Sequence, residues 1–207
     1  MDWKSLLSNH SKDINQLNII KTNSEAGEKA SLFFKNKAVC TQESGYILVE
    51  GPDAEVFLQG QVTCDVSNVV QGASVNGAHL NPQGKVIFSF LLSKLKKGLI
   101  ILDVNKPILA TAMSSLEKYA VFSKVTLSLS ENFYSFLISS KASDDLPKLT
   151  EHSSIQKLSK GIIYSIVPKI LFSKWFDLIK DDITLIHNDI SRCIRINAGL
   201  TDIYPET

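Results

Sequence analysis

The sequence has very little arginine, and its opposite charges nearly cancel. Its 207 residues include 22 Lys and Arg and 21 Asp and Glu, for a formal net charge of +1, and Arg192 and Arg195 are the only arginines. Such a balance creates no broad positive field to attract nucleic acid or an anionic membrane. The planar guanidinium groups that favour phosphate and guanine are almost absent. We therefore expect no direct nucleic-acid partner and no membrane partner.

Cysteines and long apolar runs are also scarce. Cys40, Cys64 and Cys193 lie far apart and form no C-x-x-C pair, and the four histidines are equally scattered. This excludes a disulfide framework and a zinc site and predicts small buried cysteines. The longest apolar runs, at 86–92 and 99–104, are far shorter than the ~20 residues of a membrane helix. The N-terminal segment MDWKSLLSNHSKDIN has acidic and polar residues where a signal peptide would have a long apolar core. The sequence therefore predicts a cytoplasmic protein.

The first half of the chain contains strand patterns and one short helix pattern. The segment from Asp2 to Lys29 is polar and weakly helical, and we expect it to pack loosely. KAVCT and YILVE flank QESG, which predicts a hairpin with Gly45 in its turn. GPDAEVFLQG predicts a short helix that starts at Pro52 and Asp53 and buries Val56 and Phe57.

Three further strand patterns, at 73–80, 85–93 and 98–104, predict an antiparallel meander. Pro82 and Gly84 suit a type I turn between the first two. A helical pattern follows Asn105 and should cover one face of the sheet. Later strands and two short helices lack the regular alternation of parallel β-α-β units. The fold class is therefore α+β, with antiparallel sheets and covering helices.

Four segments are most informative when taken together: GPDAEVFLQGQVTCDVS (51–67), AHLNPQGKVIFSFLL (78–92), LEKYAVFSKVTL (116–127) and RINAGLTDIYPET (195–207). In order and spacing they resemble the YgfZ family of folate-binding proteins, relatives of the glycine-cleavage aminomethyltransferase GcvT. The resemblance runs from about Tyr46 to the C-terminus. It implies a GcvT/YgfZ-like fold containing the first two domains of what is usually a three-domain ring around a folate channel.

The resemblance also implies domain boundaries. A helix-and-meander folate-binding module would occupy residues 45–119, and residues 1–44 with 120–207 would form a second, split α+β module. The family motif K-G-C-(Y/F)-x-G-Q-E lies downstream of the A-G-(I/L/F)-P segment, and this chain stops at Thr207 before it. The third domain and the hallmark cysteine would therefore be absent.

Candidate site residues follow from the same resemblance. Aminomethyltransferases carry an Asp-Asp pair after the L-N-x-x-G turn, where this chain has Phe88 and Ser89. A serine offers only neutral hydrogen bonds, so aminomethyl transfer is disfavoured. Asn197 replaces the Glu of R-L-E-A-G, and Leu91 and Ile101 align with apolar pocket positions. The resemblance implies that Ser89, Leu91, Ile101 and Asn197 bind folate, with no catalytic residue and no metal. The alternative is that they only fill a core.

The function implied is non-catalytic binding of tetrahydrofolate or a one-carbon derivative. The protein would support the assembly or maintenance of iron–sulfur proteins such as tRNA-thiolating enzymes, and so act indirectly on tRNA modification. Two alternatives stay open. One is a folate-dependent aminomethyltransferase-like one-carbon transferase, which release of methylene-tetrahydrofolate would reveal. The other is an inactive truncated paralogue, which would fold cooperatively without binding folate.

Overall fold

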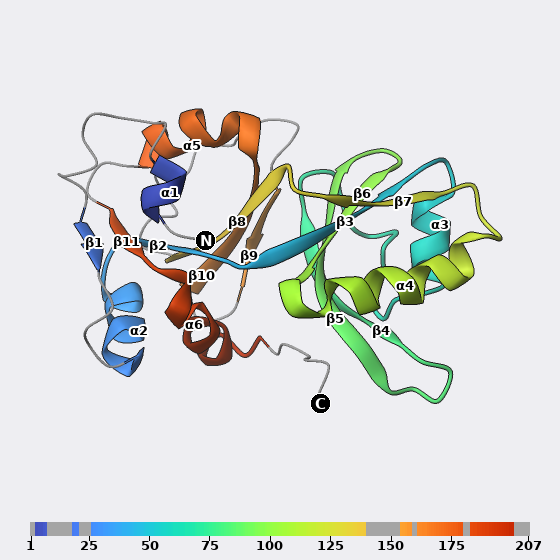
Figure 1. Cartoon of the computed structure of the whole chain (residues 1–207), viewed down its shortest axis with the longest axis horizontal. Helices are drawn as coiled ribbons and strands as arrows, with labels where there is room; N and C mark the ends of the chain where they lie inside the picture. Colours follow the sequence, from blue (N-terminus) through green and yellow to red (C-terminus); the bar gives the residue numbers. More distant parts are fainter. Residues whose placement is uncertain are drawn as a thin grey trace. The chain divides into compact units, whose positions relative to one another are not determined.

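The computed structural model describes residues 3–7, 18–20, 26–139, 154–158, 161–179 and 183–200. They form two compact units, each with its own sheet and hydrophobic core (Figure 1). The first unit is built from the described parts of Met1–Glu43, Tyr134–Thr150 and Ile155–Leu200, and the second from Ser44–Phe133. Sheets and helices occur in both, which confirms the α+β class.

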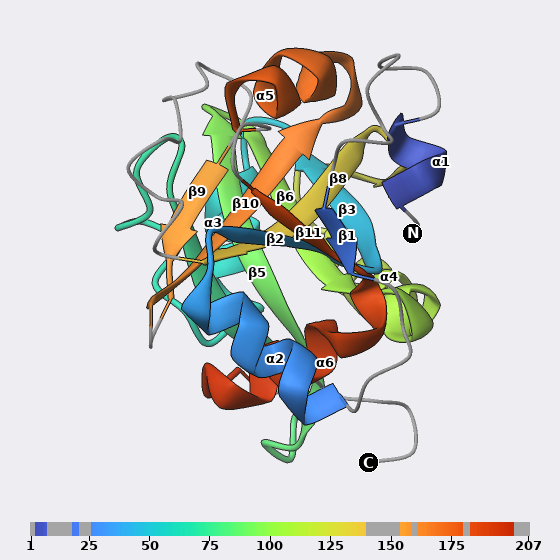
Figure 2. The same cartoon turned by 90° about the vertical axis from the view of Figure 1, so that its left-hand side faces the viewer.

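The first unit has a six-stranded sheet with helices on both faces. In spatial order its strands are β1 (Asn18–Ile20), β11 (Thr184–Ile186), β2 (Ala38–Thr41), β8 (Phe133–Ser139), β10 (Ile162–Pro168) and β9 (Ser154–Lys157). The pairs β1–β11 and β11–β2 are parallel, whereas β2–β8 is antiparallel, so this sheet is mixed. On one face lie α1 (Trp3–Leu7) and α5 (Phe172–Ile179); on the other lie α2 (Ala26–Lys35) and α6 (Ser191–Asn197), which contact each other (Figure 2).

Aromatic rings form the core under α1 and α5. The ring centroids of Phe136 and Trp175 are 4.5 Å apart, and those of Trp3 and Phe136 are 5.7 Å apart. The indole nitrogen of Trp3 donates a hydrogen bond to the carbonyl oxygen of Ile186, at 2.8 Å. Trp3 and Leu7 have no exposed surface. The predicted loose packing of the N-terminal segment is therefore wrong for α1, because large apolar side chains anchor this short helix.

Ser165 offers a test of this core. It lies on β10 between the core residues Ile163 and Val167, is 1% exposed, and its hydroxyl has no hydrogen-bond partner within the described structure. Ser139 is equally buried, but its hydroxyl accepts from the Ala38 amide and donates to the Asn36 carbonyl. An unsatisfied buried hydroxyl costs about 1–3 kcal/mol.

We expect Ser165→Ala to leave the free energy of unfolding unchanged or to raise it by about 1 kcal/mol. The matched change Ser139→Ala should lower it by about 1–3 kcal/mol, because it leaves two backbone groups unpaired. Urea denaturation of both variants measures the difference. Equal losses for the two variants would show that the Ser165 hydroxyl has a partner after all.

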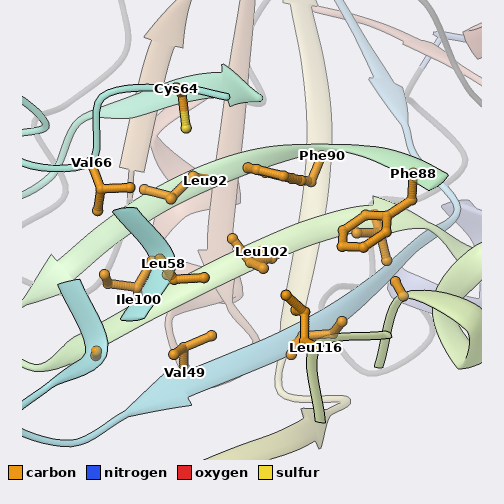
Figure 3. Close-up of a cluster of buried hydrophobic side chains, with 14 of the residues drawn as sticks. Val49, Leu58, Cys64, Val66, Phe88, Phe90, Leu92, Ile100, Leu102 and Leu116 are labelled. Atoms are coloured by element: carbon orange, nitrogen blue, oxygen red, sulfur yellow. The ribbon is translucent and has the colours of Figure 1, made fainter. Parts of the chain in front are cut away.

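The second unit has an antiparallel five-stranded sheet. In spatial order its strands are β4 (Ser74–Leu80), β5 (Val86–Lys96), β6 (Leu99–Asn105), β3 (Ser44–Glu50) and β7 (Thr126–Ser130). The predicted meander is confirmed in β4–β5–β6. Both helices of this unit, α3 (Ala54–Gln59) and α4 (Leu109–Ala120), contribute to one core on one face of the sheet (Figure 3).

Two of the informative segments shape loops beside this sheet. The Asn81 side chain accepts hydrogen bonds from the amides of Gln83 and Lys85, and the Gly84 amide donates to the Asn81 carbonyl, as the predicted turn requires. The Gln59 side chain, at the end of α3, accepts a hydrogen bond of 2.8 Å from the amide of Val66 in the loop before β4. The side chains of Asn81 and Gln59 therefore fix the backbone of the loops beside β4.

The predicted hairpin at 37–50 is wrong. Its two strands belong to different sheets, because β2 pairs with β8 whereas β3 pairs with β6 and β7. Gly45 lies inside β3 instead of a turn, and a Cβ atom there would lie 2.6 Å from Leu109 Cδ2. A close approach to α4, not a reversal of the chain, explains this glycine.

Two smaller differences concern the second unit. Phe57 is buried as predicted, but Val56 is 77% exposed, because the buried side of α3 carries Ala54 and Leu58 with Phe57. The sequence assigns residues 120–133 to the split module, whereas the structure groups them with the second unit because β7 pairs with β3 along its whole length.

Candidate functional site

The two faces of the five-stranded sheet differ in chemistry. Side chains alternate along β5, so that Phe88, Phe90 and Leu92 enter the core beneath α3 and α4 (Figure 3). Ser89 and Leu91 therefore point to the opposite face, which we call the second face. Along β6, Ile101 and Asp103 share this face with them, by the same alternation and the pairing with β5.

Two adjacent rows of directly paired residues cross the second face on all five strands. The first row contains Asn76, Leu91, Asp103, Tyr46 and Ser130. The second row contains Ser74, Ser93, Ile101, Leu48 and Ser128. Both rows have apolar or aromatic groups near the middle and hydroxyl or amide groups toward the edges. One carboxylate, that of Asp103, stands among them.

Burial differs across these rows. Ile101 has no exposed surface, and Leu91, Asp103 and Tyr46 are 5–6% exposed. Ser89 is half-buried and Asn76 is exposed. The hydroxyl groups of Ser74 and Ser93 lie 2.7 Å apart, within hydrogen-bond distance. A ligand approaching this face would therefore meet Asn76 and Ser89 before it reached the buried middle.

Three of the four predicted site residues share the second face. Ser89 and Leu91 are two positions apart on β5, and Leu91 is a diagonal neighbour of Ile101 on β6. Asn197 is the last residue of α6 in the first unit, and its side chain is exposed. Phe88, which the resemblance aligns with the other aminomethyltransferase carboxylate, is fully buried in the core under the helices.

Asp103 was missed by the sequence interpretation. It pairs directly with Leu91 on β5 and with Tyr46 on β3, and it is 6% exposed. The available signal was a single acidic residue inside the apolar run LIILDV, two positions after Ile101. Acidic residues are rarely buried without a structural or binding role.

Cysteines and metal-ligating side chains are the other candidate functional groups in the described part of the chain. Cys40 and Cys64 are buried as predicted, Cys193 is half-buried, and all three are free thiols. Burial raises the pKa of the Cys40 and Cys64 thiols above the ordinary value, which disfavours the reactive thiolate. Within the described residues, no three His, Cys, Asp or Glu side chains are placed to hold a metal ion. Nor is any helix there long and apolar enough to cross a membrane.

Comparisons with known proteins relate the chain to one group. No family model matches it. It is 30% identical over 136 residues to the tRNA-modifying protein YgfZ of Aliivibrio fischeri (strain MJ11), covering 66% of this chain and 42% of that protein. It is 39% identical over 88 residues to the tRNA-modifying protein YgfZ of Hamiltonella defensa, covering 42% of this chain and 26% of that protein.

A solved structure shares the fold. The glycine cleavage system aminomethyltransferase T from Bartonella henselae superposes with a TM-score of 0.72 at 16% identity, covering 92% of this chain and 59% of that chain. The chain spans less than half the length of the two YgfZ relatives. In sequence this chain is similar to YgfZ proteins, and in architecture it shares the fold of the glycine cleavage system aminomethyltransferase.

Proposed function

We propose that the second face of the five-stranded sheet binds the pterin ring of tetrahydrofolate or of a one-carbon derivative. The observation that carries this proposal is the position of Asp103, between Leu91 and Tyr46 in one row of paired residues. A flat heterocycle can lie against apolar and aromatic side chains, while a carboxylate accepts hydrogen bonds from neighbouring N–H groups on its edge. The aminopyrimidine edge of a pterin presents such donors.

The other residues of this face suit the same ligand. Ser89 and Asn76 lie on neighbouring strands, and their hydroxyl and amide groups can donate or accept hydrogen bonds. Ser89 stands where aminomethyltransferases have an acid, and a serine cannot act as a general base at neutral pH without an adjacent base. We therefore propose binding without one-carbon transfer. Leu91 and Ile101 complete the proposed set on this face. Asn197, on α6 of the first unit, is proposed separately as a folate-binding residue.

We further propose that the protein acts in the cytoplasm on iron–sulfur proteins such as tRNA-thiolating enzymes, and so supports tRNA modification indirectly. The name of these relatives, tRNA-modifying protein, supports the link to tRNA. A net charge of +1 and two arginines favour an indirect role over direct contact with tRNA.

A thermal-unfolding titration with tetrahydrofolate and 5-formyl-tetrahydrofolate tests the binding proposal. At a ligand concentration 100 times Kd, linkage adds about 2.7 kcal/mol of stability. For a chain of this size that raises Tm by about 5–10 °C. Ser89→Ala and Asn197→Ala should each reduce the shift, measured from the ligand-free Tm of the same variant. A flat response up to millimolar ligand would contradict folate binding by this chain.

A further inference from the structure

Strand β7 is an edge strand of the five-stranded sheet. Within the described residues it pairs only with β3. The opposite edge strand, β4, is covered at Ala78, whose carbonyl accepts from the Thr63 amide and whose amide donates to the Thr63 hydroxyl, both at 3.0 Å. The chain therefore covers part of one edge itself, whereas no described segment is hydrogen-bonded along the other.

The register of the sheet determines which backbone groups of β7 point away from it. The Gly51 amide donates to the Gly98 carbonyl at 3.0 Å, and these two residues continue the pairing of β3 with β6. Successive residues of a strand direct their N–H and C=O groups to opposite sides, so the odd-numbered residues of β3 bond to β6 and the even-numbered ones to β7. The even-numbered residues of β7 pair with the latter. Leu127 and Leu129 therefore direct both their N–H and their C=O groups outward.

These outward groups make no hydrogen bond within the described residues. The backbone groups of an open edge are a template for another strand, and proteins usually protect such edges with lysine, proline or a bulge. The segment TLSLS has no lysine and no proline, and its register with β3 is continuous. Leu129 is 56% exposed, although its partner on β3, Ile47, is fully buried. The occupant that fits this edge is an extended strand with apolar side chains beside Leu129.

Charge does not select the occupant of this edge. The five residues of β7 carry no charge. Around them lie the ammonium of Lys124 and three carboxylates: those of Glu131, of Glu50, which pairs with Thr126, and of Asp53, which accepts from the Lys124 amide. These charges are of both signs and lie outside β7. Backbone groups and leucine side chains must therefore specify the strand that pairs here.

We propose that β7 pairs with β7 of a second copy of this chain, antiparallel about a two-fold axis at Ser128. With Ser128 opposite Ser128 of the second copy, Leu127 lies opposite Leu129 of that copy, and Leu129 opposite its Leu127. Residues opposite each other in this way exchange both N–H···O bonds. Both outward N–H groups and both outward C=O groups of each copy are then paired, which no other register of the two strands achieves.

The side chains of β7 suit the same register. The pattern TLSLS reads alike in both directions, with leucine at 127 and 129 and hydroxyl groups at 126, 128 and 130. Antiparallel pairing about Ser128 places the leucines of both copies on one face and the hydroxyl groups on the other. The exposed part of Leu129 would then contact Leu127 of the second copy. Such a two-fold contact closes with two copies, and it does not depend on folate binding.

Disulfide trapping in the full chain tests the register. A Cys193→Ser background leaves only the buried Cys40 and Cys64. In the proposed dimer the Cα atom of Ser128→Cys lies about 4.5 Å from its counterpart, within the range of a disulfide. Thr126→Cys is the matched control, because it is more exposed but lies roughly 14 Å from its counterpart. We expect the Ser128→Cys dimer to form at least tenfold faster than the Thr126→Cys dimer.

A mixture of two variants gives a second reading of the register. Position 126 of one copy faces position 130 of the other, so Thr126→Cys chains mixed with Ser130→Cys chains should form the mixed dimer faster than either forms a dimer with itself. Random collision would instead favour the most exposed cysteine. Both trapping experiments leave the leucines of β7 intact, so they do not depend on whether an edge variant folds.

Sedimentation velocity from micromolar to millimolar concentrations measures the association itself. Pairing over five residues is a small interface, so we expect a weak dimer. Leu129→Pro removes an outward N–H but no hydrogen bond to β3, and it should abolish the dimer, whereas Leu129→Ile keeps the donor and should preserve it. The proposal is overturned by a monomer at every concentration, by a dimer that Leu129→Pro leaves intact, or by equal trapping of Ser128→Cys and Thr126→Cys.

Discussion

Replacing Phe88 by aspartate is expected to unfold the second unit, whereas the same substitution at Ser89 should leave it folded. Phe88 has no exposed surface and belongs to the core beneath α3 and α4. Loss of a buried phenylalanine costs about 3–5 kcal/mol, and an unpaired buried carboxylate adds several more. Such a loss consumes most or all of the roughly 5–15 kcal/mol that stabilises a typical domain.

Ser89→Asp provides the matched control on the neighbouring residue. Ser89 is half-buried on the second face, where a carboxylate can remain hydrated, so the expected cost is below about 1.5 kcal/mol. Guanidinium denaturation followed by circular dichroism measures both variants. If Phe88→Asp were as stable as Ser89→Asp, the assignment of these residues to opposite faces of β5 would be wrong. The pair therefore tests which of these two neighbouring residues faces the proposed folate site.

Asp103→Asn is expected to weaken tetrahydrofolate binding about 10–150-fold. The substitution keeps the shape of the side chain but removes the charge, and a hydrogen bond to a charged group contributes about 1.5–3 kcal/mol. Each 1.4 kcal/mol corresponds to a factor of ten in Kd. Isothermal titration calorimetry under anaerobic conditions gives the affinity directly.

Asp65→Asn is the control for charge removal in the same unit. Asp65 is exposed in the loop before β4, and hydrogen bonds from Ser67 hold the pKa of its carboxyl below the ordinary value. Its substitution should leave folate affinity unchanged. Equal losses of folate affinity in the two variants would show that the effect comes from the change in net charge. An unchanged folate affinity of Asp103→Asn would show that Asp103 does not belong to the proposed site.

Local signals predicted much of the second unit. The L-N-x-x-G turn, the meander and the helix after Asn105 depend on contacts between residues close in sequence, and all three occur. The hairpin at 37–50 failed because pairing in sheets is set by distant partners. Strand β2 pairs with β8, almost 100 residues further along the chain, and with β11, almost 150 residues further. No local sequence pattern predicts pairing between such distant segments.

The residues of the candidate site were also only partly predictable from the sequence. Ser89, Leu91 and Ile101 share one face because strand alternation and a short meander place them there. The same alternation predicts that Asp103 lies on this face. Only the structure shows that Asp103 is buried and pairs with Leu91 and Tyr46, which makes it a candidate site residue. Asn197 lies on a helix of the other unit, and sequence spacing contains no information on its distance from the sheet.

The most direct test of ligand binding on the second face is a nuclear magnetic resonance titration of the isotopically labelled chain with 5-formyl-tetrahydrofolate. Binding there predicts saturable shifts of the amide signals of Asn76, Ser89, Leu91 and Asp103, with smaller changes at buried amides of α4. Saturable shifts confined to other elements, or none at millimolar ligand, would contradict a folate site on this face of the sheet.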